Sequence, residues 1–234
     1  MNEGDGYKTG VPEYLKEAIC LGWGGAKSNL LPGAVLWVVG LTLVISYYQV
    51  EAVAAALDQV GELKVSWSPW FAMVSTALFG SLAPWILQAI FRKSGDRQPF
   101  RQVPLLMIFW GVHGWQVEWL YRIQSKLFGD GIDAMTIVKK VLVDEFVWAP
   151  FLALWQLVLG YLYIENDCSL KACREALKET SFLERAIPMV ITNWVIWIPA
   201  VSLIYLFPPS LQLPLMNLIL TLWCLILIFF AKNA

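Results

Sequence analysis

The residues best suited to chemistry in this sequence are ionisable side chains that interrupt or border apolar stretches. Glu118 and Arg122 are four positions apart, and they follow Gln116, Gly111 and Gly114 in the same stretch. On a helix, a spacing of four places an acid and a base on one face, where they can pair. Two interpretations stay open. One is a structural ion pair at a membrane boundary, with glycines that permit close helix packing. The other is the polar wall of an aqueous pathway.

A second group of acids, Asp144 and Glu145, directly precedes an apolar stretch that has Pro150 in its first turns. Acids at the start of a helix offset the positive end of the helix dipole, and this effect alone explains them. At the mouth of a pore, the same carboxylates would select cations. A short connection joins the end of one stretch near Arg122 to the start of the next near Asp144. We therefore expect Glu118, Arg122 and Asp144 to converge at one membrane boundary.

The composition gives little support to catalysis or metal binding. The chain has a single His, His113, and its four cysteines form no Cys-x-x-Cys pair, which excludes multi-His and paired-Cys metal sites. An intramembrane enzyme needs clustered nucleophiles, bases or ligands within the bilayer. One His and the lack of an acidic pair in the middle of a span argue against such an enzyme, so we expect no catalytic residue, no cofactor and no metal. A net charge of −1 gives no reason to expect a nucleic-acid partner.

Long uncharged stretches must position these residues. Hydrophobic residues make up 58% and charged residues 15% of the 234 residues, whereas a soluble domain has about 25% charged residues. A bilayer core about 30 Å thick requires about 20 apolar residues in a helix, and lipid offers the backbone no hydrogen-bond partner, so these stretches must be helical. The sequence predicts an all-α polytopic transmembrane helical bundle of about six spans. The stretches are 30–50, 65–91, 102–117, 146–164, 186–207 and 211–231.

Outside the spans, the charged segments predict two further features. Residues 1–29 are expected to form a soluble tail with a short amphipathic helix over 12–21, and residues 30–231 a single transmembrane domain. Residues 167–185 separate a charged face from an apolar one, which predicts an amphipathic helix on the membrane surface, capped by the residue at 166 or 167. Lys and Arg concentrate in the tail and in the second and fourth loops, which predicts both termini on the cytoplasmic or matrix-like side.

Residues 70–231 also contain a set of glycines, aromatic residues, prolines and polar residues in a distinctive order. These positions are Gly111, Gly114, Tyr121, Lys140, Pro150, Asn193, Trp194, Trp197, Pro199 and Pro209. Their order and spacing resemble the Mpv-seventeen family of mitochondrial and peroxisomal membrane proteins. The chain departs from the family at Glu145, where the family has Gln, and at Ile198, which separates Trp197 from Pro199. The stretch 30–50 has no counterpart in the four spans usually described for the family.

The resemblance implies a channel or pore for small solutes or metabolites, in the mitochondrial inner membrane or the peroxisomal membrane of a eukaryote. A bacterial chain would lie in the plasma membrane. The alternative function is a membrane scaffold or complex subunit without transport, because few polar residues lie in the middle of a span. The partners expected are the lipid bilayer, small solutes, and either further copies of the chain or other subunits. The candidate pore or polar-network residues are Gln116, Glu118, Arg122, Asp144 and Glu145.

Overall fold

The computed structural model describes residues 13–28, 30–91 and 98–233. Within these residues every regular element is helical, which confirms the all-α prediction. Two elements, η1 and η4, are π-helical, and η3 is a short 3₁₀ helix. In chain order the elements are α1 (Glu13–Ser28), α2 (Leu30–Gln49), α3 (Glu51–Trp67), α4 (Trp70–Ala77), η1 (Leu78–Leu82), α5 (Ala83–Phe91), η3 (Phe100–Gln102), α6 (Val103–Phe128), α7 (Ala134–Val143), η4 (Asp144–Ala153), α8 (Leu154–Glu165), α9 (Leu170–Glu179), α10 (Phe182–Ile204) and α11 (Pro209–Asn233).

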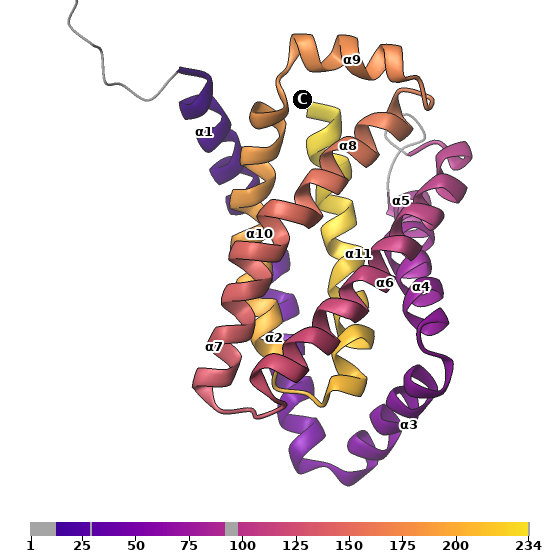
Figure 1. Ribbon diagram of the computed structural model, residues 1–234, viewed down its shortest axis with the longest axis vertical. Helices are drawn as coiled ribbons and strands as arrows, with labels where there is room; N and C mark the ends of the chain where they lie inside the picture. Colours follow the sequence, from indigo (N-terminus) through magenta and orange to yellow (C-terminus); the bar gives the residue numbers. More distant parts are fainter. Residues whose placement is uncertain (1–12, 29, 92–97, 234) are drawn as a thin grey trace, which may run out of the picture.

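The helices form an elongated bundle with two distinct ends (Figure 1). Helices α2, α6 and α10 run toward one end, which we call the α3 end because α3 lies across it. Helices α4–α5, α7–α8 and α11 run back toward the other, which we call the α9 end. The connections α6–α7 and α10–α11 therefore lie together at the α3 end.

Fewer helices than expected are long and apolar enough to cross a membrane. Beyond the three helices that qualify, a fourth candidate is the pair Trp37–Gln49 and Glu51–Trp67. This pair is long and apolar enough only if it is counted as one span, bent by 104°. The predicted count of six is thus not supported, although a helical bundle with membrane-spanning helices is. Helix α6, which contains His113, Gln116 and Glu118 in its middle, is not among the qualifying helices. The three qualifying helices among the described residues are Trp70–Ala89, Ala134–Glu165 and Phe182–Ile204.

The fourth predicted span begins earlier than expected. Asp133 is the N-cap of α7, where its carboxylate accepts a hydrogen bond from the Thr136 amide at 3.1 Å. Hydrogen bonds from Thr136 hold the pKa of the Asp133 carboxyl below its usual range. The helix then continues from Ala134 to Glu165, because α7, η4 and α8 follow one another without a break. The prediction that Asp144 stands at the beginning of a span is wrong, since a full helix of ten residues precedes it.

Three segments outside the predicted spans are helical. Helix α1, in the expected soluble tail, packs on α10 so closely that a Cβ added to Gly22 would lie 3.0 Å from the Pro188 Cα. Residues 1–12 of the expected tail lie outside the described residues. Helix α3 occupies an expected loop. Helix α9 buries none of its residues and lies across its end of the bundle (Figure 1). Its N-cap is Ser169, whose hydroxyl accepts from the Ala172 amide at 3.3 Å, and not the residue at 166 or 167. Its location on a lipid surface stays a prediction.

The two helices α4 and α6 approach each other at glycines of α6. A Cβ added to Gly111 would lie 3.3 Å from the Met73 carbonyl oxygen, and one added to Gly114 would lie 2.5 Å from that of Ala72 and against the Thr76 hydroxyl. Small residues allow this approach because no side chain separates the two backbones. Close packing at Gly114 therefore fixes the position of α6 against α4.

Substituting Gly114 with Ala is expected to destabilise the protein by about 1–3 kcal/mol, because the new methyl group overpacks against the backbone of α4. Gly24→Ala is the matched control. It is also helical, but an added Cβ meets nothing within 4 Å, so it is expected to be neutral or to stabilise by up to about 1 kcal/mol. Unfolding of the detergent-solubilised protein, followed by tryptophan fluorescence, measures both. Equal effects of the two substitutions would contradict the close approach.

Candidate functional site

The buried polar side chains of the bundle form two main groups, both built partly from α6. We call the first the Glu118 clasp; it consists of Lys64, Ser68, Glu118 and Arg122. We call the second the acid-pair cavity; it is formed around Asp144 and Glu145. The three residues that the sequence predicted to converge belong to two different hydrogen-bonded groups. Glu118 and Arg122 belong to the clasp, whereas Asp144 belongs to the cavity.

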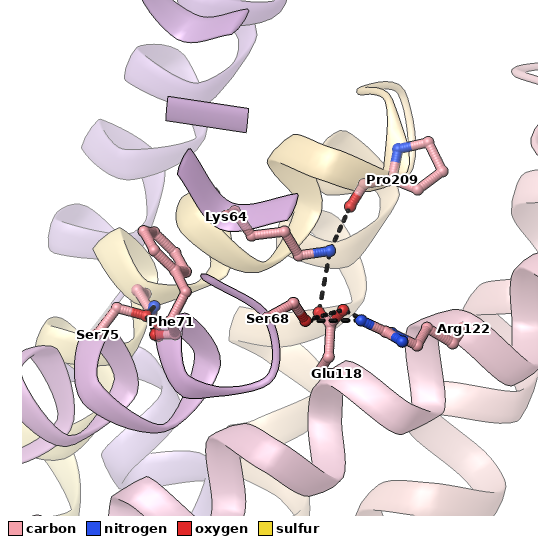
Figure 2. A network of polar contacts seen from close by, with 8 residues as sticks. Lys64, Ser68, Phe71, Ser75, Glu118, Arg122 and Pro209 are labelled. Atoms are coloured by element: carbon pink, nitrogen blue, oxygen red, sulfur yellow. Dashed lines mark hydrogen bonds and ion pairs between the residues drawn. The ribbon is translucent and has the colours of Figure 1, made fainter. Parts of the chain in front are cut away.

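The Glu118 clasp joins α3, α6 and the start of α11 at the α3 end (Figure 2). Glu118 is 1% exposed. Its Oε2 lies 3.0 Å from the Lys64 Nζ, and its Oε1 accepts from the Arg122 Nε at 2.8 Å and from the Ser68 hydroxyl at 3.3 Å. The Lys64 Nζ also donates to the carbonyl oxygen of Pro209 at 3.3 Å. The buried carboxylate thus has two cationic partners, which is the arrangement that makes a buried charge tolerable.

The two cations of the clasp differ in exposure. The Lys64 side chain is 8% exposed, whereas that of Arg122 is 49% exposed. A half-exposed ion pair contributes little because water screens it. Arg122 also donates to the Ser68 hydroxyl at 2.6 Å, so it closes the outer side of the clasp. The buried Lys64–Glu118 pair therefore dominates, and the sequence analysis missed it because Lys64 belonged to an expected loop.

The acid pair lies within the π-helical segment η4, and Pro150 explains the irregularity there. A π-helix bonds each amide to the carbonyl five residues earlier, so Pro150, which has no N–H, leaves the Glu145 carbonyl oxygen without its helical donor. The indole Nε1 of Trp194, on α10, donates to this oxygen at 2.9 Å. Two of the residues in the family resemblance, Pro150 and Trp194, thus meet at the acid pair.

Neutral donors hold both carboxylates of the acid pair. Asp144 accepts from the Tyr205 hydroxyl at 2.7 Å, and that hydroxyl in turn accepts from the Gln124 amide at 3.0 Å. Glu145 accepts from the Asn193 amide at 2.7 Å. Among the described residues, neither acid has an ion-pair partner. Glu145 is 2% exposed, so the pair is a concentration of acid in the interior without a compensating cation.

A cavity of about 60 Å³ adjoins the acid pair. It lies between α6, η4, α8, α10 and α11, and its walls are mostly aromatic and aliphatic. A cavity needs about 10–15 Å³ to hold one water molecule, so this one has room for roughly four. The polar residues that line it are His113, Tyr121, Asp144, Glu145 and Asn193, and its tryptophans are Trp110, Trp148 and Trp197.

The remaining predicted residues lie around these two groups. The Lys140 Nζ lies 3.7 Å from the Asp130 carboxylate, with which it pairs, and 5.5 Å from the centre of the Tyr205 ring. Pro199 lies inside α10, which continues through it. Gln116 belongs to neither group, and its Oε1 is buried without a hydrogen-bond partner. No group of three or more His, Cys, Asp or Glu side chains in the described part of the chain is arranged to bind a metal.

Sequence reasoning missed several residues of these sites. Tyr205 and Gln124, which complete the bonds of Asp144, carried no signal because neither is unusual at a helix end. His113, which the sequence analysis considered only as a lone metal ligand, lines the cavity. The sequence argument against an enzyme also loses one premise, because an acidic pair does lie inside a candidate span.

No family model matches the chain, and no curated protein or solved structure matches it either.

The Glu118 clasp is expected to be a stability element. Glu118→Gln leaves the buried Lys64 without a counter-charge and is expected to cost about 3–5 kcal/mol. Lys64→Met leaves the buried Glu118 with only the half-exposed Arg122 as a counter-charge and is expected to cost a similar amount. The double variant is expected to cost much less than the sum, because it leaves no buried charge unpaired. Arg122→Ala, at the exposed side of the clasp, is expected to cost less than about 1 kcal/mol. Chemical unfolding in detergent measures all four variants, and additive costs for Lys64 and Glu118 would refute the pairing.

Proposed function

We propose that this chain is an integral membrane protein that moves small polar solutes, and that the acid-pair cavity holds the solute on its way. The observation that supports this function is the burial of Asp144 and Glu145 beside a cavity, with only neutral hydrogen-bond donors. Ionisable residues inside a span are costly and usually mark a solute or ion pathway. The resemblance to the Mpv-seventeen family, itself a proposal, points the same way and would place the protein in an organelle membrane.

The alternative function is a membrane scaffold or complex subunit, and the Glu118 clasp shows what such a protein requires of its buried charges. There, a carboxylate is neutralised by Lys64 and Arg122 at short distances, and the result is a stable connection between elements. A scaffold gains nothing from a second group of acids that lacks such cations. The contrast between the clasp and the cavity therefore favours solute binding over a purely structural role.

The proposal includes six membrane crossings, with α2, α6 and α11 added to the three helices that qualify by their length and apolarity. Helix α6 is 26 residues long, which exceeds the roughly 20 residues that a bilayer requires. Its charge at Glu118 faces the bundle and is paired, so the usual objection to an acid within a span does not apply. The crossing of α6 is the step of this topology that most needs a test.

Cysteine labelling at the two ends of α6 provides that test. In a variant without the four native cysteines, Arg101→Cys and Asp130→Cys are expected to react with a membrane-impermeant maleimide from opposite sides of sealed vesicles. Both positions are exposed, so reactivity reports the side and not burial. Labelling of both from the same side would mean that α6 does not cross.

Solute flux through proteoliposomes tests the function itself. The purified protein is expected to increase the permeability of vesicles to small polar solutes, followed by stopped-flow light scattering. Asp144→Asn and Glu145→Gln are each expected to reduce this flux about tenfold or more, because hydrogen bonds to charged groups contribute about 1.5–3 kcal/mol. Glu165→Gln, the same change at the α9 end and outside the cavity lining, is the matched control and is expected to leave the flux unchanged.

The two ways in which this experiment can fail have different meanings. Wild-type protein that is folded but adds no permeability would favour the scaffold. Flux that persists in both acid variants would remove the acid-pair cavity from the pathway.

A further inference from the structure

The acid-pair cavity contains a buried polar atom that no protein group satisfies. His113 is 8% exposed and lines the cavity, and its Nδ1 is buried without a hydrogen-bond partner. Gln156 is a hydrogen-bond neighbour of the same imidazole. Most buried polar side-chain atoms in proteins have a partner. An unsatisfied nitrogen on the cavity wall therefore indicates a binding site for a ligand that supplies the missing hydrogen bond.

The charge of the cavity wall identifies the sign of that group. Asp144 and Glu145 bring carboxylates to the cavity, and the nearest lysine along the helix, Lys140, pairs with Asp130 instead. Taking a carboxylate out of water costs several kcal/mol unless a cation or several donors compensate for it. Asp144 accepts a hydrogen bond from Tyr205 and Glu145 accepts one from Asn193, and both of these donors are neutral. The wall thus favours a cationic occupant that can donate further hydrogen bonds.

The aromatic walls favour an organic ammonium over a bare metal ion. Trp148 and Trp197 line the cavity with Tyr121, and cations bind to the faces of such rings, to tryptophan most strongly. Hard metal cations instead require several oxygen ligands around one point, whereas the acids on the wall of this cavity are two, Asp144 and Glu145. Carboxylates and an unprotonated imidazole nitrogen are moreover hydrogen-bond acceptors, so they favour a cation that has N–H donors.

The size of the cavity limits the occupant further. Room for roughly four water molecules in about 60 Å³ admits ammonium or a short primary ammonium such as methylammonium. The occupant is therefore small, cationic and rich in N–H donors.

We infer that the acid-pair cavity is a binding site for ammonium or a short primary ammonium cation, held by Asp144, Glu145 and His113 and covered by Trp148 and Trp197. This inference rests on the proposed function, since it names the solute class of the same cavity. The cation donates hydrogen bonds to the two carboxylates and to the His113 Nδ1, and its charge replaces the counter-charge that the protein does not supply.

Equilibrium binding to the purified full chain in detergent tests the inference without requiring transport. Isothermal titration with methylammonium chloride is expected to give saturable binding, and ammonium chloride is expected to compete. Potassium chloride and tetramethylammonium chloride are the controls. Potassium has the charge but no N–H donor, and tetramethylammonium has no N–H donor and is too large for the cavity. At equal ionic strength, both are expected to leave the titration unchanged.

Variants assign the binding to the cavity. Glu145→Gln and His113→Phe are each expected to raise the Kd for methylammonium about tenfold or more, and Glu165→Gln is expected to leave it unchanged. His113→Phe keeps a ring of similar size in the cavity wall, so it removes the acceptor with little change in packing. Circular dichroism and tryptophan fluorescence verify that each variant is folded. If one does not fold, the other still decides the question.

The outcomes separate this inference from the proposed function. Binding of methylammonium without any vesicle permeability supports the cavity as an ammonium site and overturns transport. Vesicle permeability without methylammonium binding keeps transport and overturns the inference. Equal binding of potassium, or equal affinity in the Glu145 and His113 variants, also overturns it, because the cavity then holds water only and the cation binds elsewhere.

Discussion

The missing amide hydrogen of Pro150 is the constraint on which the arrangement of the interior depends. Within a buried helix, a carbonyl without a donor must find one elsewhere, and the indole of Trp194 provides it for Glu145. This bond fixes η4 against α10 at the level of the cavity. A π-helix also rotates through a smaller angle per residue than an α-helix, because each of its hydrogen bonds spans five residues and not four. The side chains of the adjacent Asp144 and Glu145 therefore lie closer to one side, and both line the cavity. One proline thus sets both the contact between the helices and the position of the acids.

The bundle buries its acids in two different ways, and the difference indicates what each group does. At Glu118 the charge meets Lys64 and Arg122, so breaking the group is costly and keeping it adds rigidity. At Asp144 and Glu145 the partners are a phenol and an amide, which satisfy oxygen atoms but supply no charge. Buried polar groups that are only partly compensated reduce stability, and they persist where function requires them. The clasp is therefore the structural element of the two, and the cavity is the candidate site.

Hydropathy predicted the helical class and the approximate place of each long helix, because lipid and core burial both require apolar length. It failed where polar residues continue a helix. The third stretch was expected to end near Arg122, yet Lys64 pairs with Glu118 and α6 continues to Phe128. The fourth stretch was expected to begin near Asp144, yet its helix begins after the N-cap at Asp133. Long-range partners such as Tyr205 could not be predicted, because a single sequence does not show which residues meet across the bundle.

The connection between α10 and α11 is the place where the clasp and the cavity meet. Before it, the Tyr205 hydroxyl donates to Asp144, and after it, the Pro209 carbonyl oxygen accepts from Lys64. Between these two points the Leu206 carbonyl oxygen accepts from the Tyr48 hydroxyl at 2.6 Å, which ties the connection to α2 as well. A shift of this short segment would therefore change the bonds of Asp144 and those of the clasp together. The clasp, in which charge satisfies charge, holds this segment in place, whereas the acid pair keeps only neutral partners.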